Sequence, residues 1–450
     1  MKSASSARPD CAVSYVFDST PKAATPRIAA NMRRLLLPRA AACLWGAVVF
    51  MPVGVNYLGF FLLLLAMLAA GDWRERAARV RSHPLWWPVM AFLVWQLAVL
   101  AFGRHYAETP VNLWHGLRLT ATMLMALALT REEAVWAIRG FLGIAVVNIA
   151  YIVVFYGIVL SGHTPSVPPN LFRSVIFLVG NKSINNALLF TVLGAGAAVC
   201  GLLWMTRHRP YTALLAFGVT AVAVVIINFN LMSRTSLLAL LVVLPAVCVH
   251  QWRRQWRALL IALAVGGVLV GAAAWNAPPF IEQKLATGVQ EIEAAKAGAV
   301  SEGSWVVRYY MYTETARMIL EKPLTGWGIG AWNSEWRLRG PALLADYNMP
   351  HNDYLWMGSQ TGFPGLLALL AIVLTGVWQG WKRPDLTGRI AFAAMLILLM
   401  ATSVNSALRD AQIGLSLLWI AMVCLRLAHE PVDSPEPWRE VPPRRWQRAA

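Results

Sequence analysis

The sequence predicts an all-α, polytopic integral membrane protein. Of its 450 residues, 58% are hydrophobic and only 14% are charged, which is far from the composition of soluble globular proteins. Twelve apolar runs approach or reach the length of about 20 residues that crosses a bilayer as a helix. Because lipid offers backbone groups no hydrogen-bond partners, these runs are expected to be helical. The prediction is about 12 transmembrane helices with one large, partly helical loop between spans nine and ten.

The twelve apolar runs define the expected elements in order. They cover 36–54, 57–71, 84–102, 112–129, 134–160, 184–205, 210–229, 232–250, 256–275, 362–380, 388–405 and 410–427. The expected organisation is a disordered cytoplasmic tail (1–35), transmembrane helices 1–9 (36–275), a loop domain that carries the polar motifs (276–361), transmembrane helices 10–12 (362–427) and a C-terminal tail (428–450).

The distribution of basic residues predicts the orientation. The net charge of +17 could suggest a nucleic-acid partner, but the basic residues are scattered over short loops without an aromatic-interleaved basic domain. Five alternate connections, "DWRERAARVR", "TREEAVWAIRG", "MTRHRP", "HQWRRQWR" and "GWKRPDLTGR", carry fourteen Lys or Arg, whereas the connections on the other side carry five. The positive-inside rule then places both termini in the cytoplasm and the 276–361 loop outside.

Several classes of site are excluded by absence of their motifs. The five cysteines are far apart and indicate neither a disulfide framework nor a zinc site. The chain has no Gly-rich nucleotide-binding loop, no HExxH, no Asp-x-Asp pair and no nucleophile elbow. We therefore expect no metal and no cofactor. The spans are nearly free of Asp, Glu and Lys, whereas ion-coupled transporters usually hold ionisable groups near the midplane.

The 276–361 loop is expected to contain two helices. Ile281, Leu285, Val289 and Ile292 form an apolar stripe at helical spacing, which indicates an amphipathic helix on the membrane or on the bundle. A second helix is expected from Trp305 to Leu320, ended by Pro323 and the glycine-rich "TGWGIG".

A polar cluster, "MPHNDYLWMGSQTG", follows at residues 349–362. Pro350 suits the first turn of a helix, so His351 is expected near a helix N-terminus that continues into span ten. The positive end of the helix dipole favours a neutral imidazole, which can accept a proton from a hydroxyl. A loop cap or a place in the interfacial belt is the alternative reading of an isolated His.

Two arginines are expected on the same side of the membrane as His351. Arg234 opens span eight and Arg308 lies on the second loop helix. Guanidinium groups form planar, bidentate contacts with phosphate. The alternative for each is snorkelling to lipid headgroups. Further candidates for a cationic or sugar-binding site are Lys182, Arg173, Arg118, His115, Asn352, Asp353 and Tyr354; ordinary interfacial positions and helix capping are their alternatives.

Three motifs together resemble a known family. "SRTSLLAL" opening a span, "RYYMYTETARMILEKPLTGWGIGAW" in the long loop and "PHNDYLWMGSQTGFPGLLALL" entering the next span are similar to the O-antigen ligase and polymerase superfamily. The resemblance covers about a quarter of the chain directly, and the topology extends it. It implies a GT-C-like membrane glycosyltransferase of the bacterial inner membrane that inverts the anomeric centre without a metal.

The resemblance also implies roles and partners. The donor is a glycan on undecaprenyl pyrophosphate, and the acceptor of a ligase is lipid A-core. His351 is implied as the base, and Arg308 and Arg234 as the groups that bind the leaving pyrophosphate. A polymerase or a protein-glycosylating oligosaccharyltransferase of the same superfamily is the alternative, followed by a transporter or flippase. The oligomeric state and the roles of Arg317, Arg337 and Arg339 stay open.

Overall fold

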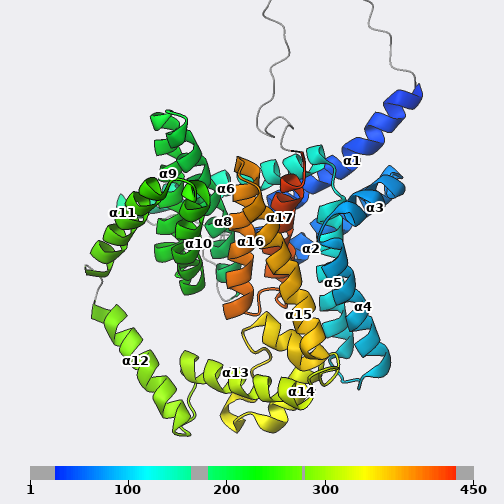
Figure 1. Ribbon diagram of the computed structural model, residues 1–450, viewed down its shortest axis with the longest axis vertical. Coiled ribbons are helices and arrows are strands. Elements are labelled where there is room, and N and C mark those ends of the chain that lie inside the picture. Colours follow the sequence, from blue (N-terminus) through cyan, green and yellow to red (C-terminus); the bar gives the residue numbers. More distant parts are fainter. Residues whose placement is uncertain (1–25, 164–180, 276–278, 432–450) are drawn as a thin grey trace, which may run out of the picture.

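The fold is built from helices alone in the ranges that the computed structural model describes, residues 26–163, 181–275 and 279–431 (Figure 1). These helices are α1 (Pro26–Val48), α2 (Val53–Ala70), α3 (Trp73–Ser82), α4 (Trp86–Phe102), α5 (Thr109–Ala128), α6 (Arg131–Leu160), α8 (Asn181–Thr206), α9 (Pro210–Val225), α10 (Arg234–Trp252), α11 (Trp256–Trp275), α12 (Pro279–Lys296), α13 (Ser304–Glu321), α14 (Ala331–Arg339), α15 (Asp353–Lys382), α16 (Leu386–Val404) and α17 (Ala411–Ala428). A π-helical turn at Ile226–Asn230 extends α9, and a 3-10 turn lies at Ala342–Leu344.

The membrane-protein prediction holds, but the count of twelve spans is not confirmed. Among the described residues, eight helices (α2, α6, α8, α9 with its π turn, α10, α15, α16 and α17) are long and apolar enough to cross a bilayer, and the bent pair α3–α4 would make nine. All twelve apolar runs lie on helices. The apolar parts of α1 and α11 are short, at Leu36–Val48 and Trp256–Val268, and α5 interrupts its apolar sequence with polar residues such as His115 and Arg118. The chain is a multi-pass membrane protein with fewer clear spans than the sequence suggests.

Helix α17 is the centre of the bundle. Every residue from Gln412 to Leu427 is buried, because α2, α5, α6, α8 and α16 all pack around it. A helix that is apolar on all sides is stable only when other elements cover every face. Trp419 of α17 stacks on Trp45 of α1 with ring centroids 4.0 Å apart.

The two ends of the bundle differ in character. At one end lie the arginine-rich turns at 71–86, 128–131, 206–210, 252–256 and 382–386, which we call the basic end. Helices α12, α13 and α14 lie across the opposite end, which we call the loop end (Figure 1). The expected helix at Trp305–Leu320 is confirmed as α13. The expected amphipathic helix is α12, but Val289 of its apolar stripe is exposed, and the side chains of Ile281 and Leu285 lie outside the described residues.

Helix α15 is broken where the loop end meets the membrane part. Gly362 has a φ of 71° and Pro364 follows it, so the regular backbone bonding stops there. The carbonyls of Ser359 and Gln360 instead accept hydrogen bonds from the N–H groups of Trp327 and Gly328, at 2.9 and 3.0 Å. The "TGWGIG" segment is therefore hydrogen-bonded to the break in α15. The first part of α15, from Asp353 to Thr361, forms a separate short helix at the loop end.

Candidate active site

His351 lies immediately before α15, not inside it. Helix α15 begins at Asp353, and Asn352 is its N-cap, whose Oδ1 accepts the N–H groups of Tyr354 and Leu355 at 2.9 and 3.0 Å. The expectation that Pro350 occupies the first helical turn is therefore wrong, since the capping amide starts the helix two residues later. His351 has a φ of 54°, an uncommon conformation for a residue with a side chain. Such strained positions concentrate at functional sites.

The surroundings of His351 keep its imidazole neutral. Burial, together with the positive charges of Arg308 and Arg409, lowers the pKa of His351 to about 4. Its carbonyl oxygen accepts a hydrogen bond from the Tyr312 hydroxyl at 3.0 Å, which ties the segment to α13, one turn after Arg308. His351 and Arg308 are thus brought together as the sequence suggested, and the imidazole has the protonation state of a base.

Arg409 is a further cation at this site, and no sequence motif assigns it a role. It lies in the connection between α16 and α17, residues 405–410, far along the chain from the loop motifs. Its guanidinium lies near His351, and its Nη1 is 3.5 Å from Oδ1 of Asn348. Burial lowers the pKa of Arg409, and among the described residues its buried Nε has no hydrogen-bond partner. In the sequence, Arg409 is only one of the five Lys or Arg residues in the connections expected outside the cytoplasm.

Two predicted binding residues, Asp353 and Arg118, form hydrogen bonds with the backbone of the segment that carries Arg409. The fully buried carboxylate of Asp353 accepts the backbone N–H of Leu408 at 2.8 Å and that of Arg409 at 3.2 Å. The fully buried guanidinium of Arg118 donates to the carbonyls of Leu408 and Arg409, at 2.8 and 3.3 Å. Both side chains are used in positioning the loop, so neither is presented to a ligand.

The other predicted binding residues divide between capping and packing roles. Asn352 also donates from Nδ2 to the carbonyl of Ser403 at 2.8 Å, and the Tyr354 hydroxyl lies 2.9 Å from Oγ1 of Thr402. His115 contacts Arg118 through Nδ1 at 3.1 Å. Arg173 lies outside the described residues, and Lys182 lies in the first turn of α8, with its side chain also outside them.

Arg234 is exposed at the first position of α10. The helix starts at the capping hydroxyl of Ser233, which accepts the Ser236 N–H. Thr235, next to Arg234, accepts a hydrogen bond from Nδ2 of Asn405 at 3.1 Å. The starts of α10 and α15 therefore meet the same 403–410 stretch, which brings Arg234 to the side of the bundle that carries His351, Arg308 and Arg409.

The three arginines of the loop end without an assigned role make ion pairs. Arg317 pairs with Glu314, Arg337 with Glu108, and Arg339 with Glu321 and Glu335. In addition, the Arg339 guanidinium lies 4.4 Å from the centre of the Trp327 ring. These contacts join α13, α14 and the α4–α5 turn. Within the described ranges, no group of three His, Cys, Asp or Glu side chains could hold a metal ion.

Comparison with known proteins shows a family similarity for part of this chain. No curated protein matches the chain. A family profile described as O-antigen ligase matches residues 219–370, about a third of the chain. The matched segment contains Arg234, Arg308 and His351, whereas Arg118 and Arg409 lie outside it. Members of that family are glycosyltransferase-like enzymes. The motif resemblance is thus supported, because residues 219–370 of this chain are similar to the O-antigen ligase family.

Proposed function

We propose that this protein is an O-antigen ligase. It transfers a glycan from undecaprenyl pyrophosphate to a sugar hydroxyl of lipid A-core at the periplasmic face of the bacterial inner membrane. The observation that carries the proposal is the neutral imidazole of His351 beside the guanidiniums of Arg308 and Arg409, inside and next to the matched domain. A base beside a phosphate-binding set is what transfer from a pyrophosphate donor requires.

The proposed reaction uses each group in one role. His351 takes the proton of the acceptor hydroxyl, and the hydroxyl oxygen attacks the anomeric carbon of the donor. The bond from that carbon to the pyrophosphate oxygen breaks, and undecaprenyl pyrophosphate leaves with the bonding electron pair. Attack opposite the leaving group inverts the anomeric centre. Arg308 and Arg234, assisted by Arg409, stabilise the charge that develops on the leaving oxygen.

Binding of the donor also changes the pKa of His351. Burial is the main cause of the low pKa of His351, and the two guanidiniums that also lower this pKa are the groups to which a pyrophosphate would bind. Their positive field is offset when an anion lies between them, so the pKa of His351 rises towards its ordinary value of about 6.5. A base is most effective when its pKa lies near the working pH. The imidazole therefore becomes a stronger base when the donor is in place.

The test is glycan transfer by the purified protein in liposomes that contain the undecaprenyl-pyrophosphate glycan and lipid A-core, with EDTA present. We expect a glycan-shifted lipid product. We expect His351→Ala to slow its formation by about a hundred- to ten-thousand-fold, the usual contribution of a general base. His105→Ala is the control, because His105 is exposed in the α4–α5 turn.

Each other outcome has a definite reading. Longer glycans on the carrier lipid without a lipid A-core product would identify a polymerase. A glycosylated protein acceptor would identify an oligosaccharyltransferase. Loss of the product with EDTA would exclude the metal-independent mechanism. Neither lipid-linked nor protein-linked product, with the donor moved across the bilayer, would favour a transporter.

A further inference from the structure

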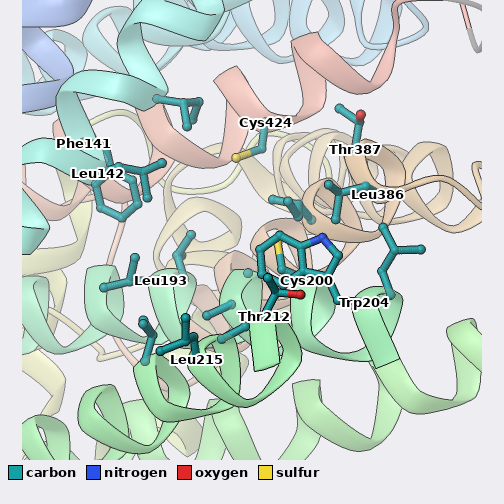
Figure 2. A pocket seen from close by; sticks show the side chains of 18 of the residues that line it. Phe141, Leu142, Leu193, Cys200, Trp204, Thr212, Leu215, Leu386, Thr387 and Cys424 are labelled. Atoms are coloured by element: carbon teal, nitrogen blue, oxygen red, sulfur yellow. The ribbon is translucent and has the colours of Figure 1, made fainter. Parts of the chain in front are cut away.

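A cavity of about 730 Å³ lies between helices α6, α8, α9, α16 and α17 (Figure 2). Its walls are apolar, with side chains such as Phe141, Leu193, Leu215 and Leu386 pointing into it. All five helices are long and apolar enough to cross a membrane. None of the residues assigned to the active site lines the cavity, so it serves a separate purpose.

Small residues on two helices create this space. Gly196, Ala197 and Cys200 of α8 and Ala216 of α9 line the cavity, and larger side chains at these positions would close it. The cavity opens to the outside of the bundle, where its lining residues Val146 and Leu215 are exposed, so a molecule from the membrane can enter it. The absence of bulk at four neighbouring positions therefore indicates that another molecule completes the packing.

The cavity extends from the basic end to the middle of the bundle. Along α8 and into the turn after it, the lining runs from Val192 to Arg207, a rise of about 22 Å at 1.5 Å per residue. One leaflet of the hydrocarbon core is about 15 Å thick, so the cavity passes through the depth of one leaflet. A transmembrane helix about 10 Å wide would fill roughly 1,700 Å³ over the same length. The cavity is too small for a partner helix, and its size suits lipid chains.

Positive charge gathers where the cavity reaches the basic end. Arg207 and Arg209, in the turn between α8 and α9, line the cavity and are exposed. Arg389 of α16 is one residue before the lining residue Ile390. It is close enough to Arg207 for the two positive charges to interact. Nε and Nη1 of Arg389 are buried, and they have no hydrogen-bond partner among the described residues. The neighbouring acid, Asp385, is paired with Arg383. An anionic group at this position would offset the excess charge.

We propose that this cavity is a binding site for an anionic phospholipid. The acyl chains occupy the apolar space between α8, α9 and α16, and the phosphate lies against Arg207 and Arg209. Basic pockets between transmembrane helices at the cytoplasmic side are the places where anionic headgroups bind. The bound lipid completes the packing of α9 against the bundle. The site is at the opposite end of the molecule from His351, and it does not depend on the reaction proposed above.

The first test is native mass spectrometry of the full-length protein in detergent, titrated with phosphatidylglycerol, cardiolipin, phosphatidylethanolamine and undecaprenyl phosphate. We expect the two anionic phospholipids to bind tightly and phosphatidylethanolamine weakly. The double variant Arg207→Gln/Arg209→Gln should bind phosphatidylglycerol roughly thirtyfold less tightly, since each arginine near an anionic headgroup contributes about fivefold. Arg74→Gln/Arg254→Gln removes two exposed charges from the same end, away from the cavity, and should bind like the unaltered protein.

The second test locates the lipid. Cys200 lines the cavity, whereas Cys248 of α10 does not, and both are half-buried. Saturating phosphatidylglycerol should slow maleimide labelling of Cys200, read by peptide mass spectrometry, and leave Cys248 unaffected. Equal slowing of both cysteines would overturn the proposal. So would equal affinity for phosphatidylethanolamine and phosphatidylglycerol, an equal loss in the control double variant, or displacement of the phospholipids by undecaprenyl phosphate at lower concentration.

Discussion

Among single residues, His351 combines three features that rarely occur together. It has a positive φ, it is half-buried, and it lies between cations from two distant parts of the chain. Each feature alone has a structural explanation, since a turn, a packed loop or an interfacial cluster would produce it. Their coincidence is typical of an active site, where strain and perturbed titration are retained for function.

The pH dependence of glycan transfer follows from the charges around His351. Its pKa of about 4 means that kcat/KM should stay level as the pH falls and decline only where the free imidazole becomes protonated, near pH 4. Arg308→Gln removes a positive charge that disfavours the imidazolium. The pKa of His351 therefore rises, and the acid limb of the kcat/KM profile should move to higher pH, on top of an overall loss of rate.

Arg317→Gln provides the control for that shift. Arg317 lies on the same helix, is exposed and is paired with Glu314, so its removal should leave the acid limb in place. The measurement is kcat/KM for the undecaprenyl-pyrophosphate glycan between pH 4 and 8. An acid limb at the same pH in Arg308→Gln and in the unaltered protein would separate Arg308 from the titration of His351.

Among the elements, the break in α15 determines where the segment with His351 lies. A straight helix would carry Asp353 and His351 along the axis of the membrane part. Gly362 instead allows the short first part of α15 to take its own direction and dock on "TGWGIG". Glycine is required at position 362 for two reasons. A Cβ there would lie 2.3 Å from the carbonyl oxygen of Leu324, and the backbone has a φ of 71°, which side chains disfavour.

Gly362→Ala should therefore destabilise the protein and slow glycan transfer. The left-handed conformation and the steric clash each cost on the order of 1–3 kcal/mol, which predicts a fall of several degrees in Tm. Gly218→Ala on α9 is the matched control, since a Cβ there meets nothing within 4 Å and alanine favours a helix over glycine. Thermal unfolding of both variants in detergent is the measurement. Equal Tm values would show that the break tolerates a side chain.

The Asp353 carboxylate joins two elements at the site. Asp353→Asn replaces one of its two accepting oxygens with an amide that can only donate, so a buried N–H of Leu408 or Arg409 loses its partner. An unsatisfied buried donor costs about 1–3 kcal/mol. We expect a lower Tm and a higher KM for the donor, because Arg409 is no longer held. Asp346→Asn, in the same loop but exposed, should match the unaltered protein in both measurements.

In the whole molecule, the two ends of the bundle carry different charge patterns and different sites. The candidate active site lies at the loop end, and the arginine-rich turns and the mouth of the lipid cavity lie at the basic end. This separation follows the charge asymmetry of the sequence, which favours the basic end in the cytoplasm.

Cysteine accessibility tests this orientation directly. In a variant whose native cysteines are replaced by alanine, Val300→Cys should react with a membrane-impermeant maleimide from the periplasm of intact cells. Arg254→Cys, in the turn between α10 and α11, should react only after the membrane is permeabilised. Both positions are exposed. Labelling of Val300→Cys only after permeabilisation would invert the orientation and place His351 in the cytoplasm.

Hydropathy and motif spacing are enough to predict the membrane class, the helical character of all twelve apolar runs and the three motifs with His351, Arg234 and Arg308. These properties are local, because hydropathy and motif spacing depend only on residues that are close together in the sequence. The helix-capping role of Asn352 is also predictable from the sequence, because Asn is a preferred N-cap residue.

Which groups share the site depends on tertiary packing, and the sequence pattern does not show it. Arg409 meets His351 although 58 residues separate them, and Arg118 and Asp353 turn out to be supports for the Arg409 segment. Arg118 and Asp353 form hydrogen bonds with the backbone of this distant segment. Such pairings depend on how the helices pack, which no local sequence pattern records. The cavity between α6, α8, α9, α16 and α17 cannot be predicted from the sequence either. Each of the five helices contributes an ordinary apolar face, and the cavity forms only when these faces pack together.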